Sequence, residues 1–241
     1  MENLPEIERI KRTYQSYADG DLSRRLWSAN NPGNRAIVTE RKSSLDKIVQ
    51  MTGLLSSSDL RILDIGCGNG DVLASYLIWG VEPDNLYGID LLPERVDAAN
   101  RRYPAFHIQQ GNAEHLAFPD EHFDMVSFFT VFSSILDTTM RQNIAMEVSR
   151  VVKPGGAIIW YDFRYRNPLN PNTRPMKRSD ISDLFPEFTL NLVTTTLLPP
   201  LARRLGRLTD SLYPMLSAIP FLRTHYIGLL MKPVSVASEG Q

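Results

Sequence analysis

The chain has 241 residues, of which 43% are hydrophobic and 22% charged, an ordinary globular composition with enough apolar side chains for a buried core. The formal net charge of −1 argues against a protein that holds nucleic acid by neutralising many phosphates. The single cysteine, Cys67, excludes a disulfide framework within the chain, and the four scattered histidines have no zinc-type spacing, so no metal dependence is expected.

The N-terminal part is expected to be helical and to carry no targeting signal. The first residues contain neither a basic run nor an apolar run, so no signal peptide is expected. No apolar run reaches the length needed to span a bilayer. The single cysteine leads us to expect a cytoplasmic location. Apolar residues at three- and four-residue steps predict a helix over 5–19, and a second helix is expected over 36–52 after a turn at 30–34.

From residue 60 onward, apolar strands alternate with amphipathic helices, which is typical of a parallel sheet with crossover helices. One helix is expected to end near Gly80, another to open at Pro93, and a third to span 138–152 and stop at Lys-Pro-Gly-Gly. The predicted strands are 61–65, 85–90, 106–110, 123–130 and 157–163.

Beyond Tyr165 the alternation loosens. A loop is expected over 166–172, and Ser179 is expected to cap a short helix that reaches Phe185. Residues 188–198 and 225–231 are predicted to be strands, with no clear crossover helix between them.

The most informative segment is a glycine-rich stretch, residues 61–73, with the sequence Arg-Ile-Leu-Asp-Ile-Gly-Cys-Gly-Asn-Gly-Asp-Val-Leu. An apolar strand leads into Asp64 and then into three glycines at alternate positions, Gly66, Gly68 and Gly70. Glycines at this density let the backbone turn tightly and approach a ligand that a Cβ would exclude. The unpaired N–H groups of the following helix point at the same place. The stretch therefore predicts a cofactor site at the carboxyl edge of a sheet.

Two classes of cofactor could bind such a loop, a dinucleotide or S-adenosylmethionine. A dinucleotide fingerprint requires Gly-x-Gly-x-x-Gly, whereas Asp71 occupies the third glycine position of that pattern here. Asp64 and Asp71 would repel a pyrophosphate, but a cofactor with a cationic sulfonium is compatible with them. In its acid-x-Gly-x-Gly-x-Gly pattern the chain resembles the class I S-adenosylmethionine-dependent methyltransferases. A nicotinamide-dependent oxidoreductase is the less favoured alternative.

Two further positions extend the resemblance. Asp90 ends a strand about twenty residues after the loop, where an acid accepts hydrogen bonds from both ribose hydroxyls of an adenosine. Asn112 and Ala113 stand where these methyltransferases usually carry an acid and a small residue for the adenine ring. Asn112 departs from that pattern, but its amide oxygen can still accept from the adenine amino group.

Residues 118–124 and 147–156 resemble scaffold motifs of the subgroup that includes the ubiquinone and menaquinone biosynthesis enzymes. The resemblance covers about residues 60–165. It implies an α/β, Rossmann-like fold with a seven-stranded, mostly parallel sheet, helices on both faces and a last strand that inserts antiparallel. We expect a single domain over 1–241, with a helical cap at 1–58, a cofactor-binding core at 59–165 and a substrate side at 166–241.

The acceptor side is expected where the fourth and fifth strands end, because ligands of such sheets lie over the carboxyl ends of the strands. Tyr161 and Asp162 are candidate catalytic residues, either as proton acceptors or as substrate anchors, and Arg164 or Arg166 can hold an anionic substrate. Plain packing of these alternating side chains is the competing interpretation. No Asn-Pro-Pro-Tyr tetrad follows the fourth strand, which disfavours base amines and glutamine amides as acceptors.

The flanks are expected to complete the substrate side. Tyr14 and Tyr17 recur one helical turn apart, and in similar enzymes an N-terminal helix closes over the cofactor. A plain packing stripe is the competing interpretation. Residues 199–223 combine leucines at three- and four-residue steps with four arginines. Such a segment can lie on a membrane surface, cover an apolar and anionic substrate such as a lipid-linked sugar, or form an ordinary core helix.

The sequence therefore predicts transfer of a methyl group from S-adenosyl-L-methionine, by in-line displacement, to a small-molecule, glycan or lipid-type acceptor. Oxygen, nitrogen and carbon acceptor atoms all remain open, and so does the oligomeric state. The alternatives are a non-catalytic S-adenosylmethionine-binding protein and a nicotinamide-dependent oxidoreductase, while an RNA methyltransferase is disfavoured by the charge balance. The predicted cofactor-binding residues are Asp64, Gly66, Cys67, Gly68, Gly70, Asp90, Leu91, Asn112, Ala113 and Thr130.

Overall fold

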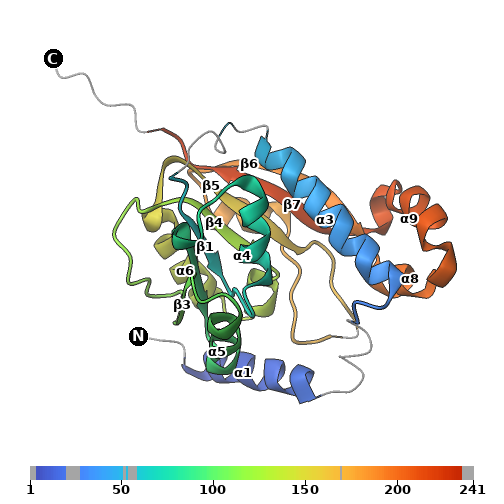
Figure 1. The fold of residues 1–241 in the computed structure, drawn as a ribbon, viewed down its shortest axis with the longest axis horizontal. Coiled ribbons are helices and arrows are strands. Elements are labelled where there is room, and N and C mark those ends of the chain that lie inside the picture. Colours follow the sequence, from blue (N-terminus) through green and yellow to red (C-terminus); the bar gives the residue numbers. More distant parts are fainter. Residues whose placement is uncertain (1–3, 20–27, 51–52, 54–58, 169, 235–241) are drawn as a thin grey trace.

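The computed structural model describes residues 4–19, 28–50, 53, 59–168 and 170–234. Within these residues the strands form one seven-stranded sheet in the order β3-β2-β1-β4-β5-β7-β6 (Figure 1). The strands are β1 (Ile62–Ile65), β2 (Leu86–Asp90), β3 (His107–Gln110), β4 (Phe123–Phe129), β5 (Val152–Phe163), β6 (Thr189–Leu197) and β7 (Arg223–Met231).

The sheet has the pairing that the resemblance implies. β1, β2, β3, β4 and β5 pair in parallel, so their carboxyl ends lie along one edge of the sheet. β7 is antiparallel to both β5 and β6 and lies between them. The predicted fold class is confirmed, including the late antiparallel hairpin.

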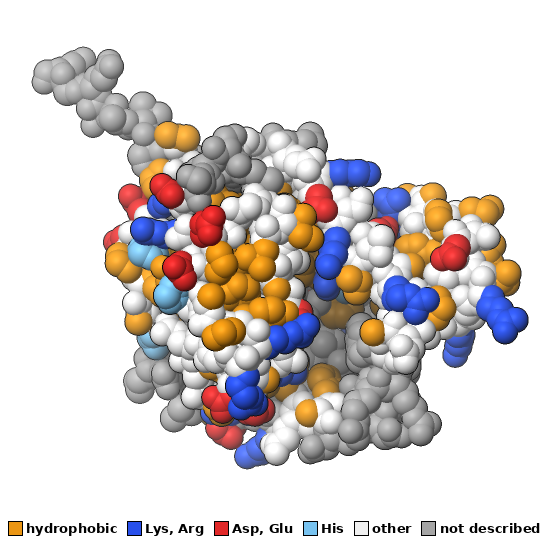
Figure 2. Space-filling view, viewed as in Figure 1, with side chains coloured by type: hydrophobic (Ala, Val, Ile, Leu, Met, Phe, Trp, Pro, Cys, Tyr) orange, Lys and Arg blue, Asp and Glu red, His pale blue; other side chains and the backbone are white. Residues whose placement is uncertain are grey.

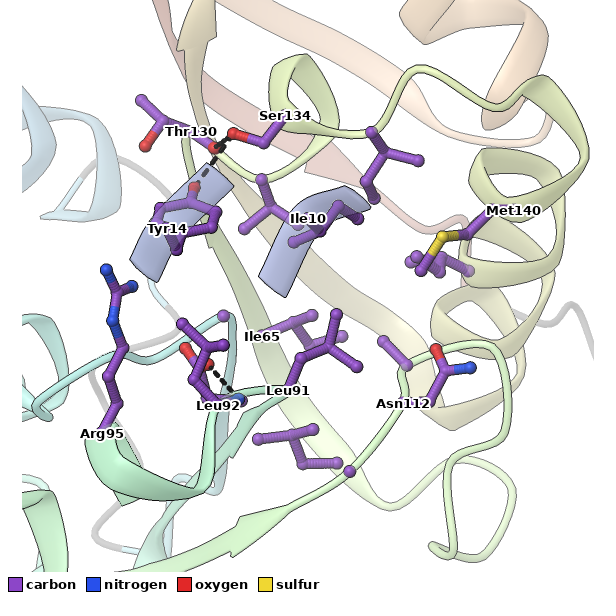
Figure 3. Close-up of a pocket in the computed structure, with 18 of the residues that line it drawn as sticks. Ile10, Tyr14, Ile65, Leu91, Leu92, Arg95, Asn112, Thr130, Ser134 and Met140 are labelled. Atoms are coloured by element: carbon purple, nitrogen blue, oxygen red, sulfur yellow. Dashed lines mark hydrogen bonds between the residues drawn. The ribbon is translucent and has the colours of Figure 1, made fainter. Parts of the chain in front are cut away.

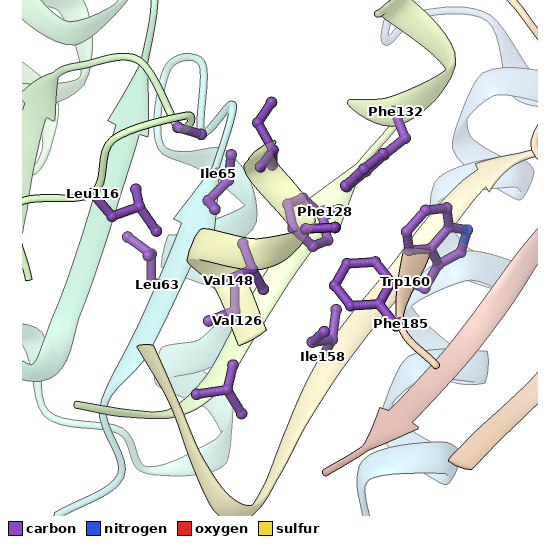
Figure 4. Packing of buried hydrophobic residues seen from close by; sticks show 14 of the residues in the cluster. Leu63, Ile65, Leu116, Val126, Phe128, Phe132, Val148, Ile158, Trp160 and Phe185 are labelled. Atoms are coloured by element: carbon purple, nitrogen blue, oxygen red, sulfur yellow. The ribbon is translucent and has the colours of Figure 1, made fainter. Parts of the chain in front are cut away.

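Helices cover both faces of the sheet (Figure 1). One face carries α1, α6 and α7, whose apolar side chains join those of Leu63, Val126 and Trp160 in one buried cluster (Figure 4). The other face carries α3, α4 and α5, which pack on Ile62 and Ile159 in a second cluster. The bounds are α1 (Leu4–Asp19), α3 (Pro32–Gln50), α4 (Asp71–Ser75), η2 (Tyr76–Trp79), η3 (Pro83–Asn85), α5 (Pro93–Arg102), η4 (Phe132–Ser134), α6 (Thr138–Val151) and α7 (Arg178–Leu184).

A small cap region, residues 199–222, joins β6 to β7. It consists of α8 (Pro199–Arg204), η5 (Gly206–Leu208), α9 (Thr209–Ser217) and η6 (Pro220–Leu222). α3 runs from the sheet to this cap region (Figure 1), and Ile37 of α3 shares a third apolar cluster with Ala202 and Tyr213. The contact is close, because a Cβ added to Gly33 would lie 2.1 Å from the carbonyl oxygen of Ala202. Part of the leucine-rich segment is therefore ordinary core.

Three local predictions need correction. α3 begins at Pro32, within the expected turn, because proline is favoured in the first turn of a helix. β5 begins at Val152, so the residues expected to stop the preceding helix form an irregularity inside a strand. Ser179 lies inside α7 and does not cap it; the carboxylate of Asp180 accepts a hydrogen bond from the backbone N–H of Lys177, the residue that precedes the helix, at 2.9 Å.

Within the described residues, no helix combines the length and the apolar character that crossing a membrane requires.

Candidate active site

The glycine loop after β1 is held against the end of β2. Gly66, Gly68 and Gly70 all have positive φ, at 70°, 55° and 79°. The backbone N–H groups of Gly66 and Cys67 donate to the carbonyl oxygen of Ile89, at 2.7 and 3.1 Å. A Cβ on Gly66 would lie 2.9 Å from the Val131 side chain, so the loop and the end of β4 approach each other as closely as only glycine permits. This is the tight cradle that the glycine pattern predicts.

Asp90, the last residue of β2, joins this loop to the turn that follows β2. Its Oδ2 accepts from the backbone N–H of Gly68 and its Oδ1 from that of Leu92, both at 2.9 Å. Each carboxylate oxygen accepts about two hydrogen bonds, so each retains accepting capacity after these contacts. Asp90 also lines the pocket described below, where that capacity is available to a pair of vicinal hydroxyls.

The pocket lies at the carboxyl ends of β1, β2 and β4 and is covered by α1 (Figure 3). The space within it and at its open mouth amounts to about 630 Å³. Most of its wall is apolar. The lining residues are Ile10, Tyr14, Ile65, Gly66, Ile89, Asp90, Leu91, Leu92, Arg95, Gly111, Asn112, Ala113, Phe129, Thr130, Val131, Ser134, Ile135, Met140 and Ile144.

Asn112 lies at one end of the pocket, in the turn after β3 (Figure 3). Its side-chain oxygen accepts from the backbone N–H of Glu114 and its amide nitrogen donates to the carboxylate of Glu114, both at 3.1 Å. These two contacts fix the orientation of the amide. The oxygen keeps capacity for a second donor, such as the amino group of a purine.

Thr130 follows β4 and lines the pocket with a strained backbone. Its φ is 58°, a conformation that β-branched residues rarely adopt. The conformation is held from both sides: its N–H donates to the carbonyl oxygen of Tyr161 at 2.7 Å, and its carbonyl oxygen accepts from the hydroxyl of Ser134 at 3.0 Å. Such strain is found mainly where a backbone position serves a ligand site.

The lid of the pocket is α1. Ile10 and Tyr14 face inward (Figure 3), and the Arg95 guanidinium lies 4.5 Å from the centre of the Tyr14 ring. Although burial opposes it, hydrogen bonds from Arg9 and from the backbone N–H of Leu136 hold the pKa of Glu6 below its usual range. Glu6 is therefore a carboxylate at neutral pH and anchors α1 to the start of α6.

Four of the predicted cofactor-binding residues do not line the pocket: Asp64, Cys67, Gly68 and Gly70. Asp64 is buried beneath the loop, where it accepts a 2.5 Å hydrogen bond from Ser127, and burial raises its pKa to about 7. Burial likewise raises the pKa of the Cys67 thiol, which packs where a side chain on Gly88 would collide with it. The other six predicted cofactor-binding residues do line the pocket: Gly66, Asp90, Leu91, Asn112, Ala113 and Thr130.

The two predicted catalytic residues also lie outside the pocket lining. The hydroxyl of Tyr161 is buried 2.9 Å from that of Thr196, and its ring stacks on His225. The carboxylate of Asp162 accepts from the backbone N–H groups of Ser133 and Phe163, at 2.9 and 2.8 Å, and burial raises its pKa to about 6. The Asp162 contacts link the segment after β4 to the end of β5, and the Tyr161 contact links β5 to β6. This arrangement gives no support to proton transfer by Tyr161 or Asp162.

Several lining residues were not predicted. Met140 and Ile144 reach the pocket from α6, and Arg95 reaches it from α5. Met140 and Ile144 are four residues apart on one helical face, which the sequence presents simply as an apolar stripe. Arg95 lies close after Asp90, but no spacing rule distinguishes it from the other arginines of α5.

Comparisons with known proteins find methyltransferases that are similar to part of this chain. A family model described as a methyltransferase domain matches residues 63–160. A fatty-acid O-methyltransferase of Mycolicibacterium smegmatis is 37% identical over 108 residues, which are 44% of this chain and 38% of that protein. A phthiotriol/phenolphthiotriol dimycocerosates methyltransferase of Mycobacterium leprae is 35% identical over 114 residues, or 46% of this chain and 41% of that protein.

Residues 63–160, which hold the first strands of the sheet and the glycine loop, match a methyltransferase domain. The fold is also similar to a crystal structure described as a putative sarcosine dimethylglycine methyltransferase from Galdieria sulphuraria. The structural alignment covers 93% of this chain and 98% of the Galdieria protein, with a TM-score of 0.64 and 14% sequence identity. The similarity of fold therefore extends beyond residues 63–160. The chain spans about two fifths of the length of the curated relatives it matches.

S-Adenosyl-L-methionine is the cofactor of this methyltransferase family, and the residues present fit it. The glycine cradle leaves no space for a Cβ at Gly66, Asp90 offers two oxygens to a pair of hydroxyls, and the oriented amide of Asn112 lies at the far end of the pocket. The apolar wall between them suits the faces of an adenine ring.

Proposed function

We propose that this methyltransferase domain transfers a methyl group from S-adenosyl-L-methionine to a lipid-type acceptor that presents an acidic oxygen. The observation that carries the proposal is the pocket itself, with Asp90 and Asn112 at separate positions along a wall that is otherwise apolar. In support, the two relatives reported above are named for a fatty acid and for phthiotriol dimycocerosates. Membership of the ubiquinone and menaquinone subgroup stays a prediction.

Five lining residues are proposed to hold the cofactor. Asp90 accepts hydrogen bonds from the two ribose hydroxyls, while Asn112 and the backbone of Ala113 contact the adenine edge. Gly66 and Thr130 border the methionine end, next to the loop. α1 closes over the adenosine and excludes water, with the Tyr14 ring as the cover.

The cofactor supplies a methyl group already activated by its sulfonium. When bound, the cofactor would give this methyl group to an acceptor oxygen, and its sulfur would leave with the bonding electron pair as a neutral thioether. The work left to the chain is alignment and exclusion of water, which account for much of the rate gain in such displacements.

The ionisable groups of the pocket indicate which acceptor suits it. Among the described lining residues these groups are Tyr14, Asp90 and Arg95. Burial raises the pKa of Tyr14, Asp90 is committed to two backbone N–H groups, and Arg95 lies on the Tyr14 ring. None is placed to take a proton from a hydroxyl. An acceptor that enters already deprotonated, such as a carboxylate, requires no base, and its product is a methyl ester.

The test combines cofactor binding with turnover. Calorimetry with S-adenosylhomocysteine should show binding by the wild-type chain and a loss of about 100-fold or more in Asp90→Ala, because two charge-assisted hydrogen bonds are removed. Asp97→Ala, an exposed acid on α5, is the matched control and should bind normally.

Turnover separates an enzyme from a binding protein. Labelled S-adenosylmethionine should yield a methyl ester with laurate and a much slower reaction with 1-dodecanol, which needs a base. Binding without turnover on either acceptor would favour a non-catalytic binding protein, and binding of NAD with no S-adenosylhomocysteine binding would favour the oxidoreductase.

We also propose that the cap region contacts an anionic lipid surface. Three of its apolar side chains are largely exposed: Leu208 at 60%, Met215 at 67% and Phe221 at 72%. The exposed Arg204 and Arg207 accompany them, and Figure 2 shows apolar and basic side chains gathered on this lobe. Exposed apolar tips beside arginines suit shallow insertion between anionic headgroups.

Vesicle sedimentation tests this surface. The wild-type chain should pellet with vesicles of phosphatidylglycerol and phosphatidylcholine, and less with phosphatidylcholine alone. Phe221→Ser combined with Met215→Ser should reduce pelleting several-fold, whereas Ile78→Ser, which removes an equally exposed apolar side chain from η2, should not. Equal pelleting of all variants would refute a role for the cap region.

A further inference from the structure

Arg41, in the middle of α3, lies over the carboxyl edge of the sheet. The central carbon of its guanidinium is 5.3 Å from the ring centre of Phe129 and 5.3 Å from that of Tyr161. These two aromatic residues are directly paired across β4 and β5. Phe129 also lines the pocket, and so does Thr130 after it. The guanidinium therefore contacts one residue of the pocket lining from the α3 side of the sheet, at the position where β4 ends.

Among the described residues, no acid forms an ion pair with this guanidinium. Within the described part of the chain, Arg41 makes no ion pair and no hydrogen bond, and aromatic faces are its contacts. Its neighbour Glu40 is directed elsewhere, because its carboxylate accepts from the backbone N–H of Thr196 and from the hydroxyl of Tyr213. A half-buried cation without a counter-charge is costly, and an anionic ligand removes that cost.

Two titratable groups near Arg41, His225 and Asp64, do not form an ion pair with it. Burial and the nearby Arg41 charge lower the pKa of His225 to about 3, so this histidine is neutral. Burial raises the pKa of Asp64 to about 7 against the opposing effect of Arg41, and the carboxyl already accepts from Ser127. Figure 2 shows a hollow between the core and the cap region with basic side chains at its rim.

We propose that Arg41 is the carboxylate-binding residue of this site. Its planar fork of donors matches a carboxylate in a bidentate contact. Two carboxylates meet at this edge if the proposed function is correct, on which this inference rests: the amino-acid carboxylate of the cofactor and the carboxylate of the acceptor. Both share the chemistry that an unpaired guanidinium recognises, and the experiment separates them.

The variants are Arg41→Gln, which removes the charge, and Arg41→Lys, which keeps the charge without the fork. Arg101→Gln, an exposed arginine on α5, is the matched control. Thermal unfolding checks that each variant is folded. Calorimetry then compares S-adenosylhomocysteine with methylthioadenosine, which keeps the adenosine and lacks the amino-acid carboxylate. The KM for laurate, at saturating S-adenosylmethionine, reports on the acceptor.

If Arg41 contacts the cofactor, Arg41→Gln should weaken the binding of S-adenosylhomocysteine by about 10- to 100-fold and leave the binding of methylthioadenosine unchanged. An acceptor contact predicts an unchanged cofactor affinity and a KM for laurate raised by about the same factor. In either case the affected quantity, the cofactor affinity or the KM for laurate, should have a value in Arg41→Lys between those of wild type and Arg41→Gln.

Two results overturn the proposal in distinguishable ways. The first result is that the wild-type chain binds S-adenosylhomocysteine, while Arg41→Gln matches Arg101→Gln both in affinity for S-adenosylhomocysteine and in the KM for laurate. In that case the proposal for Arg41 fails and the proposed function stands. If the wild-type chain binds neither S-adenosylhomocysteine nor laurate, both proposals fail together.

Discussion

The hydroxyl of Tyr14 on α1 lies 3.0 Å from the hydroxyl of Ser134 in η4, and the two residues are 120 positions apart in the chain. Ser134 in turn donates to the carbonyl oxygen of Thr130, the residue with the strained backbone at the end of β4. One line of hydrogen bonds therefore joins the lid of the pocket to the strand end where the acceptor is proposed to bind. Closure of α1 and the shape of the pocket floor are physically coupled.

Tyr14→Phe tests this coupling. The substitution removes one hydrogen bond between α1 and the core and leaves the ring in place, so the free energy of unfolding should fall by about 1 kcal/mol. S-Adenosylhomocysteine should dissociate about 2- to 10-fold faster, because the lid opens more readily. Urea unfolding and stopped-flow dissociation measure the two effects.

The matched control for this variant is Tyr17→Phe. Tyr17 stands one turn further along α1, and its hydroxyl donates to the side chain of Asn170 outside the pocket lining. It should lose similar stability with no change in dissociation rate. Equal dissociation rates in the two variants would show that the Tyr14 hydroxyl has no part in closing the pocket.

The cofactor side of the site was largely predictable from the sequence because its signals are local. The glycine spacing and the acid at the end of β2 lie within about thirty residues of each other, inside one strand–helix–strand unit. Gly66 and Asp90 accordingly line the pocket, and so do Asn112 and Thr130, which follow the ends of β3 and β4. Sequence order and strand ends were sufficient to place them.

The orientation of alternate side chains explains why some predicted site residues do not line the pocket. Ile65 lines the pocket, so Asp64, the preceding residue of the same strand, faces the opposite side of the sheet toward Ser127. Tyr161 is likewise placed on the α3 side, beneath Arg41. The role of Arg41 was not predictable, because it depends on contacts with Phe129 and Tyr161 from a helix far away in the sequence.

Gly33→Ala tests the contact between α3 and the cap region. In an unobstructed helix this change is stabilising by about 0.5–1 kcal/mol. Here the new Cβ would lie 2.1 Å from the carbonyl oxygen of Ala202, so we expect a loss of about 1–3 kcal/mol and faster proteolysis of α8 and α9. Ser43→Ala, at an exposed position of the same helix, is the control. A stabilised Gly33→Ala variant would contradict the close packing.

The buried Asp64 predicts a specific dependence of stability on pH. An aspartate in an unfolded chain ionises near pH 4, whereas folded Asp64 keeps its proton up to about pH 7. Between these values the folded state binds more protons than the unfolded state, so stability falls as pH rises through this window. Below about pH 4 and above about pH 7 this carboxyl contributes no slope. Asp162 adds a slope of the same sign up to about pH 6.

Asp64→Asn removes this contribution, because an amide has no proton to lose and its oxygen can still accept from Ser127. Urea unfolding from pH 4 to pH 8 should show a shallower decline than in wild type. At pH 8 the variant should be the more stable by about 1–3 kcal/mol, since wild type must hold a buried charge there. Asp97→Asn, at an exposed position, should follow the wild-type curve. A slope unchanged in Asp64→Asn would mean that Asp64 is ionised in the folded protein at every pH tested, a state that the charge of Arg41 favours.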